Sequence, residues 1–158
     1  MHSIKTRSRR FRKKNAINRK PPIKLVTFSV GNEQYAIAIH AVQRILQESI
    51  PTNLMEQGLA LKEYDSQTLT LINLSRVLSH SDPCDYHYLI IGILKNGDRI
   101  GIPVSQMPSI LDIPEEKITD IPDSYRQANL HPCLDKLLHT ADGKIVFALN
   151  LEKLIAPE

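Results

Sequence analysis

The sequence predicts a mainly β protein built from two small, similar barrels that share a core. Three observations predict this class. A hairpin signal occurs twice, the apolar residues after each hairpin turn repeat at a fixed spacing, and a strand ending in Asn-Leu also occurs twice. Many short strands separated by turns are typical of closed or sandwiched β-structure. With 158 residues, 42% of them hydrophobic, the chain has the size of about one globular domain.

The two hairpins open the two halves of the chain. Residues 24–39 read KLVTFSVGNEQYAIAI, with a turn at Gly31-Asn32, and residues 86–104 read YHYLIIGILKNGDRIGIPV, with a turn at Asn96-Gly97. Such turns need positive φ, which these residues tolerate. After each turn the same apolar positions follow 65 residues apart, in the order Tyr35, Ile37, Ile39, Val42, Ile45, Leu46 and Ile100, Ile102, Val104, Met107, Ile110, Leu111.

Each half closes in the same way. LTLINLSRVLS and IVFALNLEKLI both run an apolar strand into Asn-Leu and then a turn or short helix, with Asn73 and Asn150 at equivalent positions 77 residues apart. The spacing grows from 65 to 77 because the second connecting loop, residues 112–143, is longer. Neither half is large enough to bury much surface alone, so we expect the halves to share a core.

The second strand of each hairpin has a bulky face and a small face. Because side chains alternate along a strand, we expect the bulky face (Tyr35, Ile37, Ile39 and Ile100, Ile102, Val104) to point into a core. The small face consists of Ala36 and Ala38, then Gly101, Pro103 and Ser105. It could admit another backbone or helix from a partner, but we favour packing of this face against the other half of the chain.

The charge of the chain is unevenly distributed. Residues 1–20 hold nine basic residues and no acid, whereas the remainder has eleven basic residues against all seventeen acids, a net charge of −6. Pro21-Pro22 marks the boundary, so we expect a basic arm at residues 1–22 and a folded domain at residues 23–158. The arm could hold phosphate groups of nucleic acid or anionic membrane through Arg9, Arg10, Arg12, Lys13 and Lys14. It could equally be a disordered, solvated segment.

A search for catalytic chemistry returns little. The sequence contains no nucleophile elbow, no phosphate-binding loop and no dinucleotide fingerprint. The polar stretch HSDPCDYH at residues 80–87, with His131 and Cys133, could in principle surround zinc, but its spacing matches no established zinc motif, and a polar linker is the commoner meaning. We therefore expect no enzyme activity, no cofactor and no metal. Two cysteines, no long apolar run and no signal-peptide pattern predict a reduced, cytoplasmic protein.

Four stretches resemble the CheW family, the adaptors that couple chemoreceptors to the histidine kinase CheA in bacterial chemotaxis arrays. FSVGNEQYAIAIHAVQRIL is similar to the family's opening hairpin and V-x-E-I segment, and GLALKEYDSQTLTLINL to G-V-I-N-L-R-G followed by P-V-I-D-L. IGIPVSQMPSIL and ALNLEKLI are similar to its G-L-x-V-D-x-V-x-E-V and L-D-L-E-K-L-L segments. The similarity covers roughly residues 23–156.

The resemblance implies two intertwined five-stranded SH3-like barrels with one or two short helices, no catalysis and no cofactor. It implies that one surface pairs with the kinase regulatory domain and that a groove between the barrels takes the tip of the chemoreceptor's helical hairpin, which would bring the protein to membrane-bound receptor arrays. By resemblance, the partner-binding residues would be Ala36, Ala38, Val42, Gly58, Lys62, Glu63 and Ser105.

The chain departs from the family at several charged positions. The Asn-Leu-Arg-Gly loop is missing, and Lys62 would stand in for its arginine without offering that residue's bidentate donor. Arg44 stands where glutamate is usual, Ser105 replaces an aspartate, and Asn73 and Asn150 replace the aspartates of the two strand ends. The leading hypothesis is a diverged adaptor of this kind. The alternatives are a β-barrel protein whose arm binds nucleic acid or membrane and, more remotely, a metal-dependent domain.

Overall fold

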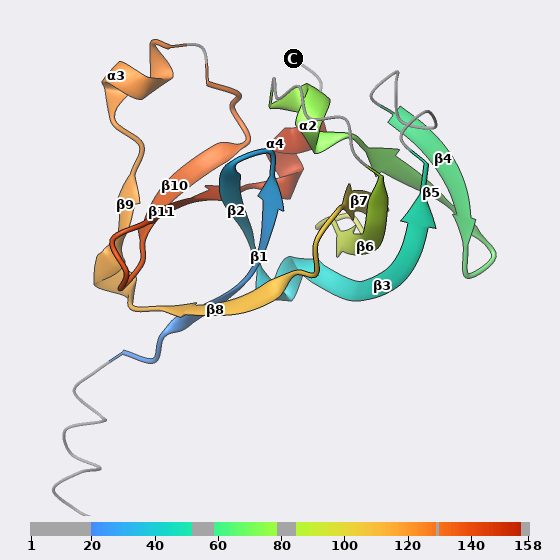
Figure 1. Ribbon diagram of the computed structural model, residues 1–158, viewed down its shortest axis with the longest axis horizontal. Coiled ribbons are helices and arrows are strands. Elements are labelled where there is room, and N and C mark those ends of the chain that lie inside the picture. The colour runs from blue at the N-terminus through green and yellow to red at the C-terminus, as the bar shows by residue number, and fades with distance from the viewer. Residues whose placement is uncertain (1–19, 52–58, 79–84, 129, 156–158) are drawn as a thin grey trace, which may run out of the picture.

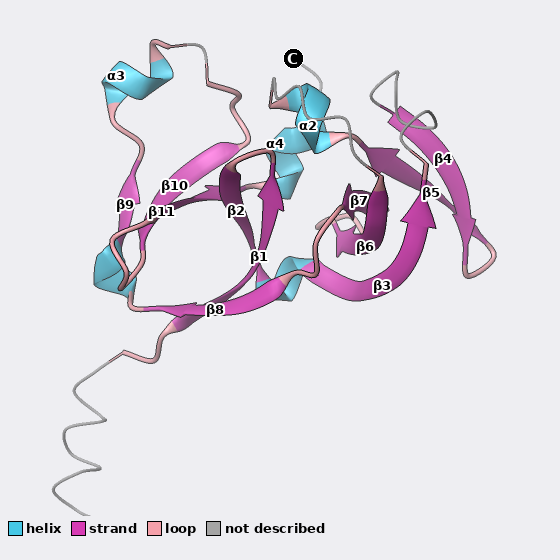
Figure 2. Cartoon of the chain, viewed as in Figure 1, coloured by secondary structure: helices cyan, strands magenta, loops and turns pink. Residues whose placement is uncertain are grey.

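The computed structural model describes residues 20–51, 59–78, 85–128 and 130–155. Figures 1 and 2 show two curled β-sheets beside each other, with short helices at their ends. Sheet A has six strands in the order β8 (Ser109–Ile113), β1 (Ile23–Val30), β2 (Glu33–Ala38), β11 (Ile145–Leu149), β10 (Leu134–His139) and β9 (Ile118–Asp120). Sheet B has five, in the order β3 (Val42–Ile50), β6 (Tyr86–Ile93), β7 (Arg99–Val104), β5 (Gln67–Ile72) and β4 (Leu59–Tyr64).

Each half of the chain contributes strands to both sheets. The first half gives β1 and β2 to sheet A and β3 to β5 to sheet B, whereas the second half gives β6 and β7 to sheet B and β8 to β11 to sheet A. Corresponding strands occupy the same places in the two sheets, and β9 is an addition to sheet A. The prediction of two intertwined, mainly β barrels is therefore confirmed.

The register of the parallel strand pairs matches the spacing of the sequence repeat. Tyr35 lies opposite Phe147 where β2 pairs with β11, and Ile100 lies opposite Thr70 where β7 pairs with β5. Tyr35 and Ile100 are 65 residues apart, and Thr70 and Phe147 are 77 apart. Both spacings read from the sequence thus relate residues at equivalent points of two similarly paired sheets.

The repeated Asn-Leu pair starts a helix of about one turn in each half. The Asn73 side chain accepts from the Arg76 backbone N–H at 3.3 Å at the start of α2 (Leu74–Val77), and the Asn150 side chain accepts from the Glu152 N–H at 2.9 Å at the start of α4 (Leu151–Ile155). An asparagine in this position satisfies a backbone donor that the helix itself cannot pair. The leucines that follow both asparagines are buried in the shared core.

The shared core forms between the two sheets from their bulky faces. Tyr35 and Ile37 of sheet A belong to the same buried cluster as Ile100, Ile102 and Val104 of sheet B. Of the predicted core positions in these strands, Ile39 is the exception. It is 39% exposed because the chain leaves the strand after Ala38 and enters the 3-10 turn η1 (Ile39–Ala41), which ends the alternation of side chains.

The small faces line the interiors of the barrels, where they pack against strands of the other half of the chain as well as of their own, as expected. Ala36 is fully buried in a cluster with Leu25, Leu138 and Val146 of sheet A. Gly101 lies among leucines of sheet B, where an added Cβ would come within 2.5 Å of the Leu71 side chain. The interior of a small curled sheet has room for one layer of side chains, and the small residues of β2 and β7 leave that room to leucines on neighbouring strands.

In the part of the chain that the structure describes, the remaining helical elements are the 3-10 turn η3 (Glu115–Lys117) and the helix α3 (Asp123–Arg126), both in the second half. The β9 and α3 segment makes the second connection longer, as the sequence spacing predicts, and α3 projects from sheet A in Figure 1. Within the described parts of the chain, no helix is long and apolar enough to cross a membrane.

Candidate interaction site

The duplication builds the same crevice twice, once on each side of the boundary between the sheets. One crevice is bordered by Ala38 at the end of β2, His40 after it, Leu94 after β6, and Glu152 of α4. The other is bordered by the residues that correspond to these in the repeat, Pro103 and Ser105 with β7, Val30 of β1, and Ser75 of α2. Because equivalent residues line both, the crevices are equivalent features of the two halves.

The two crevices differ greatly in size. The crevice beside Ala38 encloses about 410 Å³, whereas the one beside Ser105 encloses about 20 Å³. The smaller crevice is lined by Tyr86, which is 7% exposed, and has Pro103 where the larger has Ala38. We call the larger one the open crevice. Its lining comes from both sheets and from α4, so it is a groove between the barrels.

The open crevice has an apolar floor and a mixed polar rim. Ile37, Leu149 and Leu151 line it and are buried. His40, Lys95, Asp135 and Glu152 border it, and the Glu152 carboxylate accepts a hydrogen bond from the Lys95 backbone N–H at 2.8 Å. An apolar groove with a few polar groups at its edge can accept the apolar face of an amphipathic segment.

The partner-binding residues predicted from the resemblance do not all lie together. Ala38 borders the open crevice and Ser105 the closed one, while Val42 is half-buried against the shared core. Ala36 has no exposed surface, so no partner can touch its side chain, and its place among the contact residues is corrected. Gly58 and the arm residues Arg9, Arg10, Arg12, Lys13 and Lys14 lie outside the described residues.

Lys62 closes the barrel of sheet B rather than pointing freely outward. Its Nζ pairs with Glu48 Oε1 at 2.5 Å, which joins the edge strands β4 and β3. Beside it, Arg44 Nη1 donates to the Tyr64 hydroxyl at 3.2 Å across the same seam. Glu63, the next residue along β4, is exposed. Two of the positions at which the chain departs from the family's charges therefore make structural contacts inside this domain.

Sequence reasoning missed a set of exposed apolar side chains close to the crossovers between the sheets. Ile45 on β3 and Ile110 on β8 are 38% and 57% exposed, and Met107 just before β8 is 71% exposed. Ile45 and Ile110 are equivalent in the repeat and lie opposite the buried Ile90 and Val26. In Figure 1, β8 and β3 follow one edge of the molecule. The 65-residue repeat contained these residues, but apolar identity alone does not distinguish an edge position from a core position.

The residues considered for metal or nucleophilic chemistry do not form a centre in the described part of the chain, where no group of three potential ligands occurs. Residues 80–84 of the polar stretch lie outside that part. Cys133 is fully buried, and burial raises the pKa of its thiol to about 12, which keeps the thiol protonated and unreactive near neutral pH. His131 Nδ1 accepts from the Cys133 backbone N–H at 3.0 Å, which fixes the turn before β10.

Comparison with known protein families and structures assigns this chain to a family. The CheW-like domain model matches residues 24–158, nearly all of the chain outside the basic arm. The chain belongs to the CheW family. Its structure is similar to the crystal structure of the scaffolding protein TtCheW from Thermoanaerobacter tengcongensis, with a TM-score of 0.72 at 19% sequence identity, over 87% of this chain and 94% of that one. A comparison with curated protein sequences finds no significant match.

Family membership confirms the resemblance and places the chain among the adaptor and scaffold proteins of chemotaxis signalling. It also clarifies two of the departures from the family pattern. Asn73 and Asn150 stand where the family's segments carry aspartate, and both cap helices here. Asparagine and aspartate are almost equally good at this position. The loss of charge at these two sites therefore leaves the local structure intact.

Proposed function

We propose that this CheW-like protein is a non-catalytic adaptor that couples a chemoreceptor to a CheA-type histidine kinase, in chemotaxis or a related motility system. It would act in the cytoplasm at receptor arrays, with its folded domain making the contacts and the basic arm dispensable for them. The observation that carries the proposal is the open crevice between the barrels, which offers a receptor helix an apolar floor at the junction of the two sheets.

The receptor side of the proposal rests on the shape and composition of the open crevice. Ala38 and Ala41 have small side chains, so a helix backbone can approach the floor formed by Ile37 and Leu149. Ile39 is exposed on the adjoining turn and adds apolar surface for the same helix. The polar rim would fix the register of a helical hairpin tip, since charged groups at an edge contribute more to specificity than to affinity.

The kinase side of the proposal rests on the seam between β3 and β4. Glu63 is exposed there, and the Lys62 to Glu48 pair holds the two edge strands together beside it. In this proposal, Lys62 acts by shaping the contact surface, while Glu63 meets the kinase regulatory domain. A contact of this kind would be moderate in strength and reversible, as transient signalling interfaces are.

The experiment is a pair of calorimetric titrations of the full-length chain, one against the cytoplasmic tip fragment of a receptor and one against a CheA-type regulatory domain. We expect micromolar binding in both. Ala38→Leu fills the open crevice and should weaken receptor binding by about tenfold, or 1.4 kcal/mol, without changing kinase binding. Ala141→Leu, the same substitution in an exposed turn, is the matched control and should change neither.

Removal of residues 1–20 separates the two main hypotheses. The adaptor proposal requires both affinities to survive this deletion. Absence of binding to either fragment, combined with binding of DNA or anionic vesicles that disappears with the arm and falls steeply with salt, would overturn it in favour of the nucleic-acid or membrane alternative.

A further inference from the structure

The two sheets carry equivalent rows of side chains on the faces that point toward the shared core. In sheet A the row crosses β1, β2, β11 and β10 as Phe28, Tyr35, Phe147 and Leu137. In sheet B the equivalent row crosses β6, β7, β5 and β4 as Gly92, Ile100, Thr70 and Leu61. Three aromatic side chains in one sheet thus correspond to a glycine, an isoleucine and a threonine in the other.

The aromatic row fills its site in sheet A. The rings of Phe28 and Tyr35 lie 6.3 Å apart, those of Tyr35 and Phe147 lie 5.9 Å apart, and Leu137 at the end of the row is 5% exposed. Such ring spacings are typical of packed aromatic pairs. In the equivalent place in sheet B, Thr70 and Ile100 of the row border a hollow of about 880 Å³, and Leu61 at the end of the row is 69% exposed.

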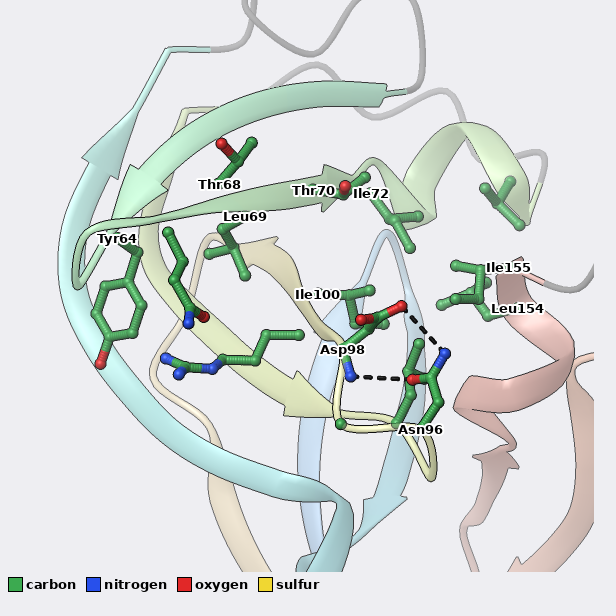
Figure 3. A pocket seen from close by; sticks show the side chains of 15 residues that line it. Tyr64, Thr68, Leu69, Thr70, Ile72, Asn96, Asp98, Ile100, Leu154 and Ile155 are labelled. Carbon is green, nitrogen blue, oxygen red and sulfur yellow. Dashed lines mark hydrogen bonds between the residues drawn. The ribbon is translucent and has the colours of Figure 1, made fainter.

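Sheet B, the β6–β7 turn and the helices α2 and α4 surround this hollow. Figure 3 shows Leu154 and Ile155 extending from α4 toward Ile72 and Ile100 across the space. The hollow is separate from the open crevice, since among the described residues Leu94 alone lines both. Its volume falls in the range of sites that bind a ligand or a partner's side chains.

One cation borders the hollow and is weakly paired. Arg99 is 23% exposed, and its closest carboxylate among the described residues is that of Asp65, at 3.8 Å, with the Tyr64 ring 6.0 Å from the guanidinium carbon. The Asp98 carboxylate accepts from the Asn96 side chain, as the dashed line in Figure 3 shows. A guanidinium has five N–H donors, so Arg99 can bind a further carboxylate through a bidentate pair of hydrogen bonds.

We propose that this hollow is a docking site for a partner protein that inserts an aromatic side chain and places a neighbouring carboxylate on Arg99. The aromatic side chain takes the position that Phe147 and Tyr35 fill in sheet A. A protein rather than a small molecule fits the site because exposed Leu61 adjoins Thr70 in the same row and lies outside the hollow. A protein surface can cover Leu61 and fill the hollow at once.

The test uses short peptides and amide chemical shifts of the full-length, isotope-labelled chain. Acetyl-Phe-Glu-amide should produce saturable shifts at residues that line the hollow, with a dissociation constant of about 1 mM, or −4 kcal/mol, as expected for a small fragment. Acetyl-Phe-Gln-amide tests the carboxylate and acetyl-Ala-Glu-amide tests the ring, and each should bind about three- to tenfold more weakly. Arg99→Gln should reduce the affinity for the Phe-Glu peptide to that of the Phe-Gln peptide.

Thr70→Phe fills the hollow from within and gives an independent test. It should abolish peptide binding and raise the Tm by a few degrees, since it restores in sheet B an aromatic side chain that sheet A already packs at the same register. Absence of saturable shifts, binding that is indifferent to Arg99→Gln, binding that survives Thr70→Phe, or a lower Tm in that variant would each overturn the proposal. None of these outcomes bears on the open crevice, so the adaptor proposal stands or falls separately.

Discussion

Gly101→Ala tests the finding that the small faces of the hairpins line the barrel interiors. A Cβ at this position would lie 2.5 Å from Leu71 Cδ2, 3.0 Å from Leu89 Cδ1 and 3.1 Å from Leu69 Cδ2. These three leucines are at most 2% exposed, so none can swing into solvent to relieve the contact. Overpacking of this kind costs about 1–3 kcal/mol. The loss of glycine's freedom in the unfolded chain offsets about 0.4–1 kcal/mol of that cost.

The midpoints of these two ranges leave a net loss of about 1.3 kcal/mol for Gly101→Ala, measured as a lower urea midpoint at unchanged m-value. Adding Leu71→Val removes bulk at the tightest contact, so the double variant should lose at least about 0.5 kcal/mol less than the sum of the two single losses. Ala36→Gly at the equivalent position of sheet A is the matched comparison and should also destabilise. A Gly101→Ala protein as stable as the parent would refute the barrel-interior assignment.

Two further predictions concern the helix caps and the buried thiol. Asn150→Ala should lower the free energy of unfolding by about 1 kcal/mol while Asn150→Asp preserves it, because both asparagine and aspartate can accept a hydrogen bond from the Glu152 N–H. Urea denaturation of the parent and the two variants measures these changes. Equal losses for both variants would contradict the prediction. Burial raises the pKa of Cys133 to about 12 from an ordinary value of 9.0, so stability should fall as the pH rises above about 9, because the unfolded chain then releases a proton that the folded chain keeps. Cys133→Ala should make this decline shallower, and an identical pH dependence in both proteins would exclude the thiol as its source.

Much of the architecture was open to prediction because the chain carries two copies of one pattern. The hairpin turns, the 65- and 77-residue spacings and the Asn-Leu joints fix equivalent positions, and the parallel pairs at Tyr35 and Ile100 follow those spacings. Local signals of this kind depend on backbone preferences that act over a few residues. These features can therefore be predicted from the sequence without knowledge of tertiary contacts.

The sequence could not predict in the same way which face of each hairpin turns toward the interior of its curled sheet. Alternation along β2 and β7 separates bulky from small residues, but it does not reveal which side becomes the interior of a curled sheet. Each face has buried residues, such as Ile37 and Ala36 on β2, so burial preference could not decide between them. The same limit applies to Ile39 and Leu61, whose exposure depends on where a strand ends and on what covers its outer face.

The two proposed sites lie where the two copies of the repeat differ. A symmetric pair of barrels would present each surface twice and could not assign different partners to different faces. Pro103 borders a nearly closed crevice whereas Ala38 borders its open equivalent, and Thr70 and Ile100 border a hollow where the equivalent Phe147 and Tyr35 are in ring contact. Each difference is a change of side-chain volume on a retained backbone, which costs little provided that the total core remains filled. For an adaptor that must hold unlike partners in a fixed arrangement, divergence of packing between duplicated halves is a direct route to distinct contact surfaces.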